Sequence, residues 1–148
     1  MKAIKTVLFD YAGVITPVRN NYQFALKYSQ RFGLKPEVLM KITYDNWSDA
    51  ATGKLDCYTF WKQIANKLSI SPEELRDLVI DTFPVDKRMI NIIRKTHQKY
   101  TTVLFSNQIK DWVEKVIEDN KIQDIFDHLI NSYIVGARKP DEKMFFKH

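Results

Sequence analysis

Residues 5–16, KTVLFDYAGVIT, decide the fold expected of this chain. Their first five residues form a short apolar run, which ends at the carboxylate of Asp10 and is followed by the turn-forming Gly13. A brief β-rich run that ends in a turn is typical of a buried parallel strand. The chain is therefore predicted to begin with a strand that places an acid at one end of a sheet.

Two later stretches repeat this arrangement. Residues 101–105, TTVLF, form a second predicted strand that ends at Ser106 and Asn107, and residues 129–134 form a third that leads into the loop 135–140. Helical patterns, with apolar residues three or four positions apart, separate the strands. This alternation indicates an α/β fold, a Rossmann-like parallel sheet with three recognisable strands.

Polar residues follow each predicted strand. Asp10 follows the first strand, and Ser106 with Asn107 follows the second. Arg138 and Lys139 lie in the loop after the third. Because open parallel sheets bind ligands at the carboxyl ends of their strands, we expect these residues to lie together. A carboxylate, a hydroxyl and an ammonium at one edge suit phosphoryl transfer, and a divalent cation such as Mg²⁺ would offset the repulsion between carboxylate and phosphate.

A helical segment lies between the first and second strands. Helix starts are marked there by Asp56 and by Ser71, which precedes a proline and two glutamates. We expect three or four helices whose aromatic side chains form the segment's own core rather than a substrate pocket. These aromatic residues are Tyr44, Trp47, Tyr58 and Trp61. The predicted division is a core of residues 1–16 and 85–148 around an inserted helical domain of residues 17–84.

The composition fits a protein with one compact core and favours a cytoplasmic location. With 148 residues, of which 45% are hydrophobic, the chain can bury roughly 70% of its unfolded surface. The net charge of +5 comes from lysines and arginines interleaved with acids, so no nucleic-acid partner is expected. No apolar stretch approaches the roughly 20 residues of a membrane span. The single Cys57 and the lack of a signal-peptide pattern favour a cytoplasmic protein.

Three motifs in order resemble the signatures of haloacid dehalogenase (HAD)-like hydrolases. They are residues 9–16, FDYAGVIT, residues 104–107, LFSN, and residues 136–141, GARKPD. Residues 53–55 and 126–128 also resemble the subgroup with a small helical cap, which includes the phosphatase-like domain of soluble epoxide hydrolases. The resemblance spans nearly the whole chain. It implies a Mg²⁺-dependent hydrolase that acts on small phosphate monoesters.

The resemblance also implies roles for individual residues. Asp10 would be the nucleophile, forming an aspartyl-phosphate, and would ligate Mg²⁺ together with the main-chain carbonyl of Ala12. Ser106 and Asn107 would contact the phosphate, and Lys139 would balance its charge. The inserted helical domain would be a cap that closes over the site and selects the leaving group.

The sequence departs from the family pattern in two places. Family phosphatases often have a general acid, an aspartate, two residues after the nucleophile, where this chain has Ala12. Such an acid is worth roughly 10²–10⁴ in rate. The family also has a fourth strand whose acids complete the Mg²⁺ site, and the remaining acidic ligand is absent from this sequence. Asp141 and Glu142 are expected to open a helix instead.

Without a fourth strand, the strand that ends at Asp10 is expected to be an exposed edge. We therefore expect either a C-terminally truncated chain or a homodimer formed through that edge. Two other functions stay open. A catalytically silent HAD fold that serves binding or association would explain Ala12 and the missing acids. A metal-independent haloacid dehalogenase, with an ester at Asp10, would not need those acids.

Overall fold

The computed structural model describes residues 4–146 and contains one three-stranded parallel sheet. Its strands are β1 (Thr6–Phe9), β2 (Thr101–Ser106) and β3 (His128–Asn131), in the spatial order β1-β2-β3. Phe9 of β1 lies opposite Leu104 of β2, and Ser106 of β2 lies opposite Asn131 of β3. The α/β class predicted from the sequence is confirmed. Among the described residues β1 pairs with β2 alone, and a homodimer through this edge stays a prediction.

Five helices follow β1 and form what we call the helical insert, residues 22–80. They are α1 (Tyr22–Tyr28), α2 (Pro36–Tyr44), α3 (Trp47–Ala51), α4 (Cys57–Leu68) and α5 (Pro72–Ile80). The predicted number of three or four was too low, because α3 has only five residues and cannot display a helical period. Both predicted caps are confirmed. Oδ1 of Asp56 accepts a hydrogen bond from the N–H of Thr59, and Oγ of Ser71 accepts one from the N–H of Glu74.

The remaining helices belong to the core and lie before or after the strands β2 and β3 in the chain. They are α6 (Lys87–His97), α7 (Lys110–Asn120), the 3₁₀ turn η1 (Gln123–Ile125), α8 (Ser132–Val135) and α9 (Lys143–Phe146). Ile93 of α6 and Trp112 of α7 join Phe9 and Leu104 in one buried apolar cluster. Side chains alternate along a strand, so Leu8 points to the opposite face, where it lines an open hollow of about 600 Å³. One face of the sheet therefore carries the core.

The third strand is shorter than the sequence predicts. A strand was expected over residues 129–134, but β3 ends at Asn131 and the chain turns at once into α8. The side chain of Asn131 caps α8 by accepting a hydrogen bond from the N–H of Tyr133, 2.8 Å away. Gly136, with a φ of 73°, ends the helix. An asparagine cap and a glycine stop thus outweigh the β propensity of the residues after Ser132.

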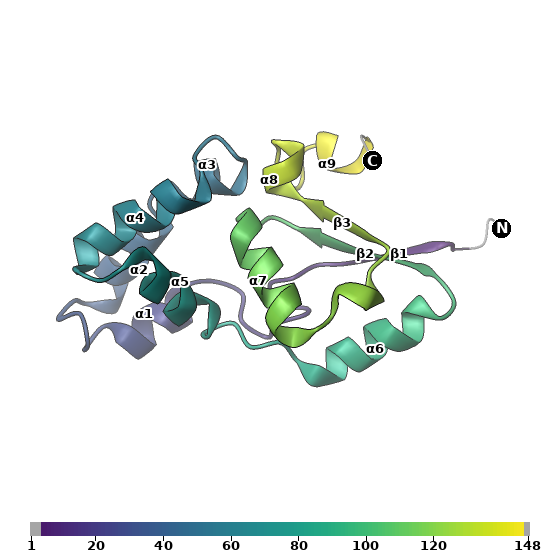
Figure 1. Cartoon of the computed structure of the whole chain (residues 1–148), viewed down its shortest axis with the longest axis horizontal. Coiled ribbons are helices and arrows are strands. Elements are labelled where there is room, and N and C mark those ends of the chain that lie inside the picture. The colour runs from purple at the N-terminus through teal and green to yellow at the C-terminus, as the bar shows by residue number, and fades with distance from the viewer. Residues whose placement is uncertain (1–3, 147–148) are drawn as a thin grey trace.

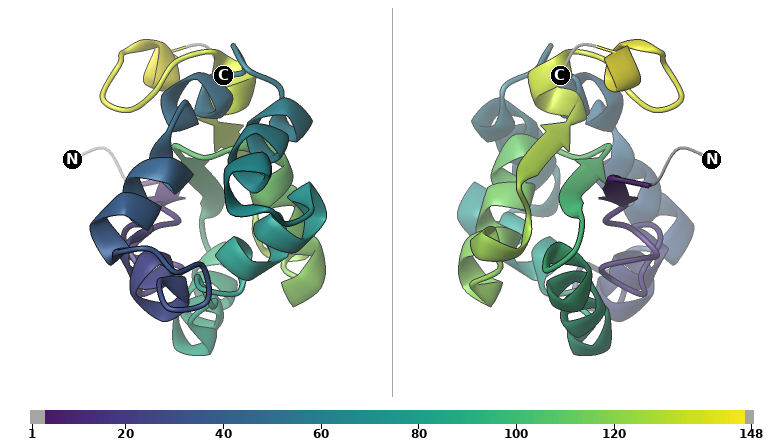
Figure 2. Two further views of the ribbon diagram at one scale, coloured as in Figure 1. Left: turned by 90° about the vertical axis from the view of Figure 1, so that its left-hand side faces the viewer. Right: turned by 90° about the vertical axis from the view of Figure 1, so that its right-hand side faces the viewer.

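Figure 1 shows the helical insert on one side of the molecule and the sheet, with α6 and α7, on the other. Residues 10–21 and 81–86 are the two linkers that join them. Away from these linkers, α3 lies beside α8, as both views in Figure 2 also show. The insert therefore meets the core near the linkers, where α4 and α5 contact α7, and again where α3 contacts α8. No helix in residues 4–146 is long and apolar enough to cross a membrane.

Candidate active site

The segments that were expected to converge meet at the carboxyl end of the sheet. Nζ of Lys139 lies 2.8 Å from Oδ1 of Asp10, the residue that follows β1. The same ammonium donates a hydrogen bond to the main-chain oxygen of Phe105 in β2, at 2.9 Å. An ammonium has three N–H donors, so one donor of Lys139 remains for an incoming anion.

Asn107 fixes the loop that carries Lys139. Its Oδ1 accepts a hydrogen bond from the N–H of Lys139 at 2.7 Å, and its Nδ2 donates one to the carbonyl oxygen of the same residue at 3.3 Å. Asn107 does not cap the following helix, because the N-terminus of α7 has no side-chain cap. The amide side chain therefore positions the backbone of Lys139.

Ser106 and Ala12 lie at the same edge of the sheet. Ser106 is the last residue of β2 and is buried, with 2% of its surface exposed. Ala12 is half-buried in the loop after Asp10 and forms an isolated bridge with Thr16. The structure therefore places every residue that the sequence predicted for the site near the strand ends, but only Asp10, Asn107 and Lys139 are joined through the contacts given above.

The loop after Asp10 requires glycine at position 13. Gly13 has a φ of +79°, and a Cβ at this position would lie 3.0 Å from Cγ of Arg19. A larger residue would therefore be strained by its backbone and by this neighbour. The N–H of Gly13 also donates to the carbonyl oxygen of Val18 at 3.1 Å, which closes the loop. This turn holds Val18, further along the first linker, close to the loop that follows Asp10.

Tyr11, the neighbour of Asp10, is a structural residue. Its side chain is buried, its hydroxyl donates to the carbonyl oxygen of Phe83 at 3.4 Å, and Nε1 of Trp112 donates to the same hydroxyl at 3.3 Å. Burial raises the pKa of Tyr11 to about 12. The phenol thus stays protonated and hydrogen-bonded inside the core. It therefore cannot replace the aspartate general acid that is missing at position 12.

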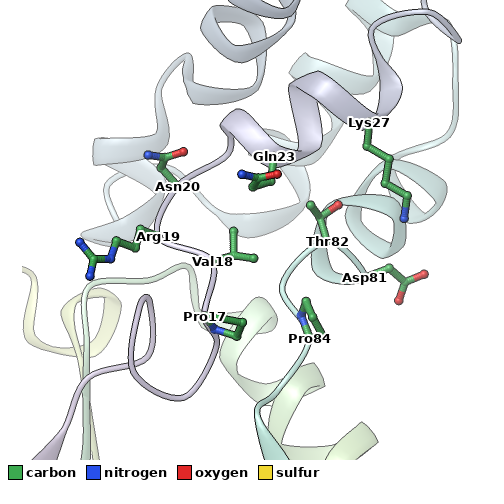
Figure 3. A pocket seen from close by; sticks show the side chains of 9 residues that line it. All are labelled: Pro17, Val18, Arg19, Asn20, Gln23, Lys27, Asp81, Thr82 and Pro84. Atoms are coloured by element: carbon green, nitrogen blue, oxygen red, sulfur yellow. The ribbon is translucent and has the colours of Figure 1, made fainter.

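A cavity of about 550 Å³ lies between the two linkers of the helical insert. Figure 3 shows Arg19, on the first linker, and Lys27, on α1, at opposite ends of its lining. The amide side chains of Asn20 and Gln23 lie between these two cations in the same view. Asp81 also lines the cavity, on the side of Lys27, so the polar lining carries charges of both signs.

The sequence did not reveal how the insert is joined to the core. Trp47 is 8% exposed and belongs to the buried cluster, as expected, whereas the prediction was wrong for Tyr44 and Tyr58, which are 44% and 58% exposed. Nε1 of Trp47 also donates to Oε1 of Gln108 in the core, at 3.4 Å. Arg138 places its guanidinium over the Trp47 ring, 4.7 Å from the centroid, and donates to Oγ of Ser48 at 2.9 Å. In the sequence, Arg138 was notable only because it precedes Lys139 in the third motif. Its contacts with α3 were not predicted, because hydrophobic periodicity carries no information on contacts between distant segments.

Oxygen ligands for one Mg²⁺ are available at Asp10 and Ala12. Within residues 4–146, Oδ2 of Asp10 and the carbonyl oxygen of Ala12 make no hydrogen bond, whereas Oδ1 of Asp10 is engaged by Lys139 and by the N–H of Tyr11. Mg²⁺ commonly takes one or two carboxylates and completes its shell with phosphate and water oxygens. The residues present therefore fit the ion.

The acids expected from a fourth strand have no substitute in the described part of the chain. No group of three or more His, Cys, Asp or Glu side chains in residues 4–146 is arranged to hold a metal ion. Oδ1 of Asp141 instead accepts a hydrogen bond from the N–H of Lys143 at 2.9 Å, which agrees with the prediction that Asp141 opens a helix. Within residues 4–146, Mg²⁺ would thus be held by Asp10 and Ala12 together with oxygens of the substrate or solvent.

A family model for haloacid dehalogenase-like hydrolases matches residues 4–147. The chain belongs to this family. The resemblance carried by the three motifs is therefore confirmed at the level of the HAD family. No curated protein matches the chain.

Solved HAD structures share the fold. A HAD family enzyme from Bacteroides thetaiotaomicron has a TM-score of 0.74 at 19% identity, over 97% of this chain and 76% of that one. A predicted HAD-like hydrolase from Porphyromonas gingivalis has a TM-score of 0.68 at 18% identity, over 97% and 74% of the two chains. An L-2-haloacid dehalogenase from Xanthobacter autotrophicus, with chloropropionic acid covalently bound, has a TM-score of 0.63 at 15% identity, over 97% and 62%. At these identities the likeness concerns the fold.

Proposed function

We propose that this HAD-family chain is a Mg²⁺-dependent phosphohydrolase of small phosphate monoesters, acting through an aspartyl-phosphate at Asp10. The main support is the contact of the Lys139 ammonium with Oδ1 of Asp10, 2.8 Å away, at the carboxyl end of the sheet. A carboxylate beside a fixed cation is placed to attack phosphorus, while the cation attracts the phosphoryl oxygens.

The reaction has two steps at Asp10. One carboxylate oxygen attacks phosphorus, forming an acyl phosphate as the bond to the leaving oxygen breaks, and water then cleaves the acyl phosphate and releases inorganic phosphate. Lys139 uses its remaining N–H donor for a phosphoryl oxygen and is kept in position by Asn107. When bound, Mg²⁺ offsets the repulsion between the carboxylate and the phosphate.

Ala12 determines which esters this mechanism favours. A methyl side chain cannot protonate the leaving oxygen, and Tyr11 is buried in the core with its pKa raised to about 12. The leaving group must therefore depart as an anion or take its proton from water. We propose that aryl and acyl phosphates, whose leaving groups are weak bases, are better substrates than alkyl phosphates.

We propose that the helical insert acts as a cap over this site. The insert meets the core both at the linkers and at α8, and so it extends across the strand ends (Figure 1).

The Bacteroides enzyme supports the choice of ligands, because its wild-type form and an aspartate-to-alanine variant were both crystallised with magnesium and inorganic phosphate. We expect the same ligands to bind here.

The test is hydrolysis of p-nitrophenyl phosphate by the purified chain with and without Mg²⁺. We expect Mg²⁺-dependent release of inorganic phosphate and a phosphoenzyme that survives acid quenching. Asp10→Asn should abolish both, because an amide is a poor nucleophile. Asp124→Asn, at an exposed site in η1, is the matched control and should leave both unchanged. Full activity of Asp10→Asn would show that Asp10 is not the nucleophile.

Metal-independent dehalogenation is the second candidate. It is favoured by Ala12 and by the lack of an acidic cluster in residues 4–146, because an ester formed at Asp10 by halide displacement requires neither a general acid nor metal-binding acids. Release of chloride from 2-chloropropionate in the presence of a chelator would establish it. If the chain hydrolyses neither phosphate esters nor 2-chloropropionate, the third function remains, a catalytically silent HAD fold that serves association.

A further inference from the structure

The contact between α3 and α8 involves the same two loops that carry the proposed catalytic residues. α3 lies beside α8 at the end of the helical insert away from the linkers (Figure 1). Gln108, which accepts a hydrogen bond from Trp47 of α3, directly follows Asn107. Arg138, which contacts Trp47 and Ser48, directly precedes Lys139. The insert is thus attached next to both Asn107 and Lys139.

Arg138 holds α3 through two different interactions. Its guanidinium carbon lies 4.7 Å from the centroid of the Trp47 ring, within the range of a cation–π contact. One terminal nitrogen donates to Oγ of Ser48 at 2.9 Å. A planar guanidinium can stack and donate at once, whereas a lysine ammonium cannot reproduce this combination. The contact therefore depends on arginine at this position.

Ser132 adds a second attachment of α3 to the core. Its hydroxyl donates to the carbonyl oxygen of Ala51 at 2.5 Å and accepts from the N–H of Gln108 at 3.1 Å, in a fully buried position. Gly53 lies two residues after the end of α3. A Cβ at this position would lie 3.0 Å from the carbonyl oxygen of Tyr133 in α8. The close approach of these two segments shows that α3 is docked on α8 rather than merely near it.

We propose that Arg138 is a positioning residue that clasps α3 and thereby couples closure of the insert to the position of Lys139. The proposal rests on the proposed function, in which the insert is a cap and Lys139 contacts the phosphoryl group. A substrate enters between insert and core, so the clasp has to open and close. Nε of Arg138 is buried without a hydrogen-bond partner among the described residues, so the closed clasp leaves one donor of the guanidinium unsatisfied. This cost weakens the closed clasp.

Tryptophan fluorescence tests the clasp without any assay of activity. The three tryptophans, Trp47, Trp61 and Trp112, are all buried. Arg138→Met should loosen α3 and make Trp47 accessible, so quenching by acrylamide should increase. Most of the increase should disappear in the double variant Trp47→Phe with Arg138→Met, because Trp47 is the tryptophan that Arg138 contacts. Arg88→Met, whose side chain is 91% exposed on α6, is the control and should match the wild type.

Kinetics distinguish positioning from a general structural role. Arg138→Met should lower kcat/KM for p-nitrophenyl phosphate by about tenfold, the scale of one hydrogen bond with one cation–π contact. Acetyl phosphate should lose kcat/KM by a similar factor, because the displaced Lys139 contacts the phosphoryl group that both substrates share. Arg138→Lys should give intermediate quenching and intermediate kcat/KM, because it keeps the charge without the planar fork.

Two results would overturn the proposal. One is unchanged acrylamide quenching in Arg138→Met. The other is a lower unfolding midpoint of Arg138→Met than of the wild type, which would attribute the loss of kcat/KM to a less stable fold and mark Arg138 as a structural residue. If the wild-type chain hydrolyses neither substrate, the proposed phosphatase function fails, and the quenching comparison still decides whether the clasp exists.

Discussion

The ammonium of Lys139 lies 2.8 Å from Oδ1 of Asp10 and 2.9 Å from the main-chain oxygen of Phe105. One side chain thereby joins the end of β1, the end of β2 and the loop after α8. The backbone of Lys139 is held separately by Asn107. Because both ends of the lysine are fixed, a phosphoryl group bound as proposed above would meet a cation already in position, which would lower the reorganisation needed in the transition state.

Lys139→Met should therefore impair catalysis far more than folding. We expect kcat/KM to fall by about 10²–10³-fold, as for the loss of one preorganised electrostatic contact. The Asp10 side chain is 46% exposed, so the ion pair itself should contribute only about 0–1 kcal/mol to stability. Steady-state kinetics and urea unfolding measure the two effects. Lys143→Met, on the exposed side of α9, is the control, and equal activities of the two variants would contradict the role of Lys139.

Ala12→Asp should change the dependence on the leaving group. Without a general acid, the wild-type kcat/KM should fall steeply across a series of aryl phosphates as the pKa of the leaving phenol rises. A carboxylic acid at position 12 should protonate the poorest leaving groups and raise alkyl phosphate hydrolysis by about 10²-fold. Activated aryl esters should change little. Ala12→Asn adds similar volume without an acidic proton, so a gain of the same size there would rule out acid catalysis as the reason.

Tyr11→Phe should destabilise the fold. The variant removes the acceptor of the Trp112 N–H and the donor to Phe83 within the core. A buried donor left without a partner costs about 1–3 kcal/mol, which urea unfolding can measure at pH 7. Tyr58→Phe, at a ring that is 58% exposed, is the control and should cost little.

The same tyrosine predicts an alkaline loss of stability. Its pKa is raised to about 12 in the fold, so the folded state favours the protonated phenol. This contribution is fully present below the ordinary tyrosine pKa of about 10 and is lost as the pH rises from there towards 12. Tyr11→Phe should remove that part of the pH dependence, and an unchanged alkaline profile would contradict it.

The sheet was predictable because its signals are local. Each strand is a short run with a polar residue at its end or directly after it, and a parallel sheet brings such ends to one edge whatever lies between them. The third strand was overpredicted because Asn131 caps a helix through a contact two residues away, which competes with the β propensity of the same residues. The short helix α3 was missed because five residues cannot show a period.

The site was only partly predictable. Asp10, Asn107 and Lys139 stand in recognisable motifs, but the family resemblance implied that Asn107 contacts the phosphate and gave no sign that it holds the backbone of Lys139. The attachment of Arg138 to Trp47 and Ser48 joins residues about 90 positions apart. Such a contact depends on how the insert docks, and neither composition nor periodicity encodes docking.

Asp127 should make stability depend on acid pH. Its Oδ2 accepts a hydrogen bond from the N–H of Thr102 in β2 at 2.8 Å and lies 3.3 Å from Nδ1 of His97 on α6. The main-chain hydrogen bond from Thr102, together with the charge of His97, lowers the pKa of Asp127. Because the fold favours the ionised carboxyl, this stabilisation is present above the ordinary aspartate pKa of about 4 and is lost as the pH falls through the lowered value.

Asp127→Asn should therefore be less stable than the wild type at pH 7, and the difference should shrink as the pH falls below about 4. The asparagine keeps the shape and can still accept a hydrogen bond, so the variant isolates the charge. Urea unfolding between neutral and acid pH measures the difference, and Asp124→Asn, an exposed acid in η1, should show no such trend. A difference that stays constant down to acid pH would mean that Asp127 acts through its shape and hydrogen bonds, because protonation would then not affect its contribution.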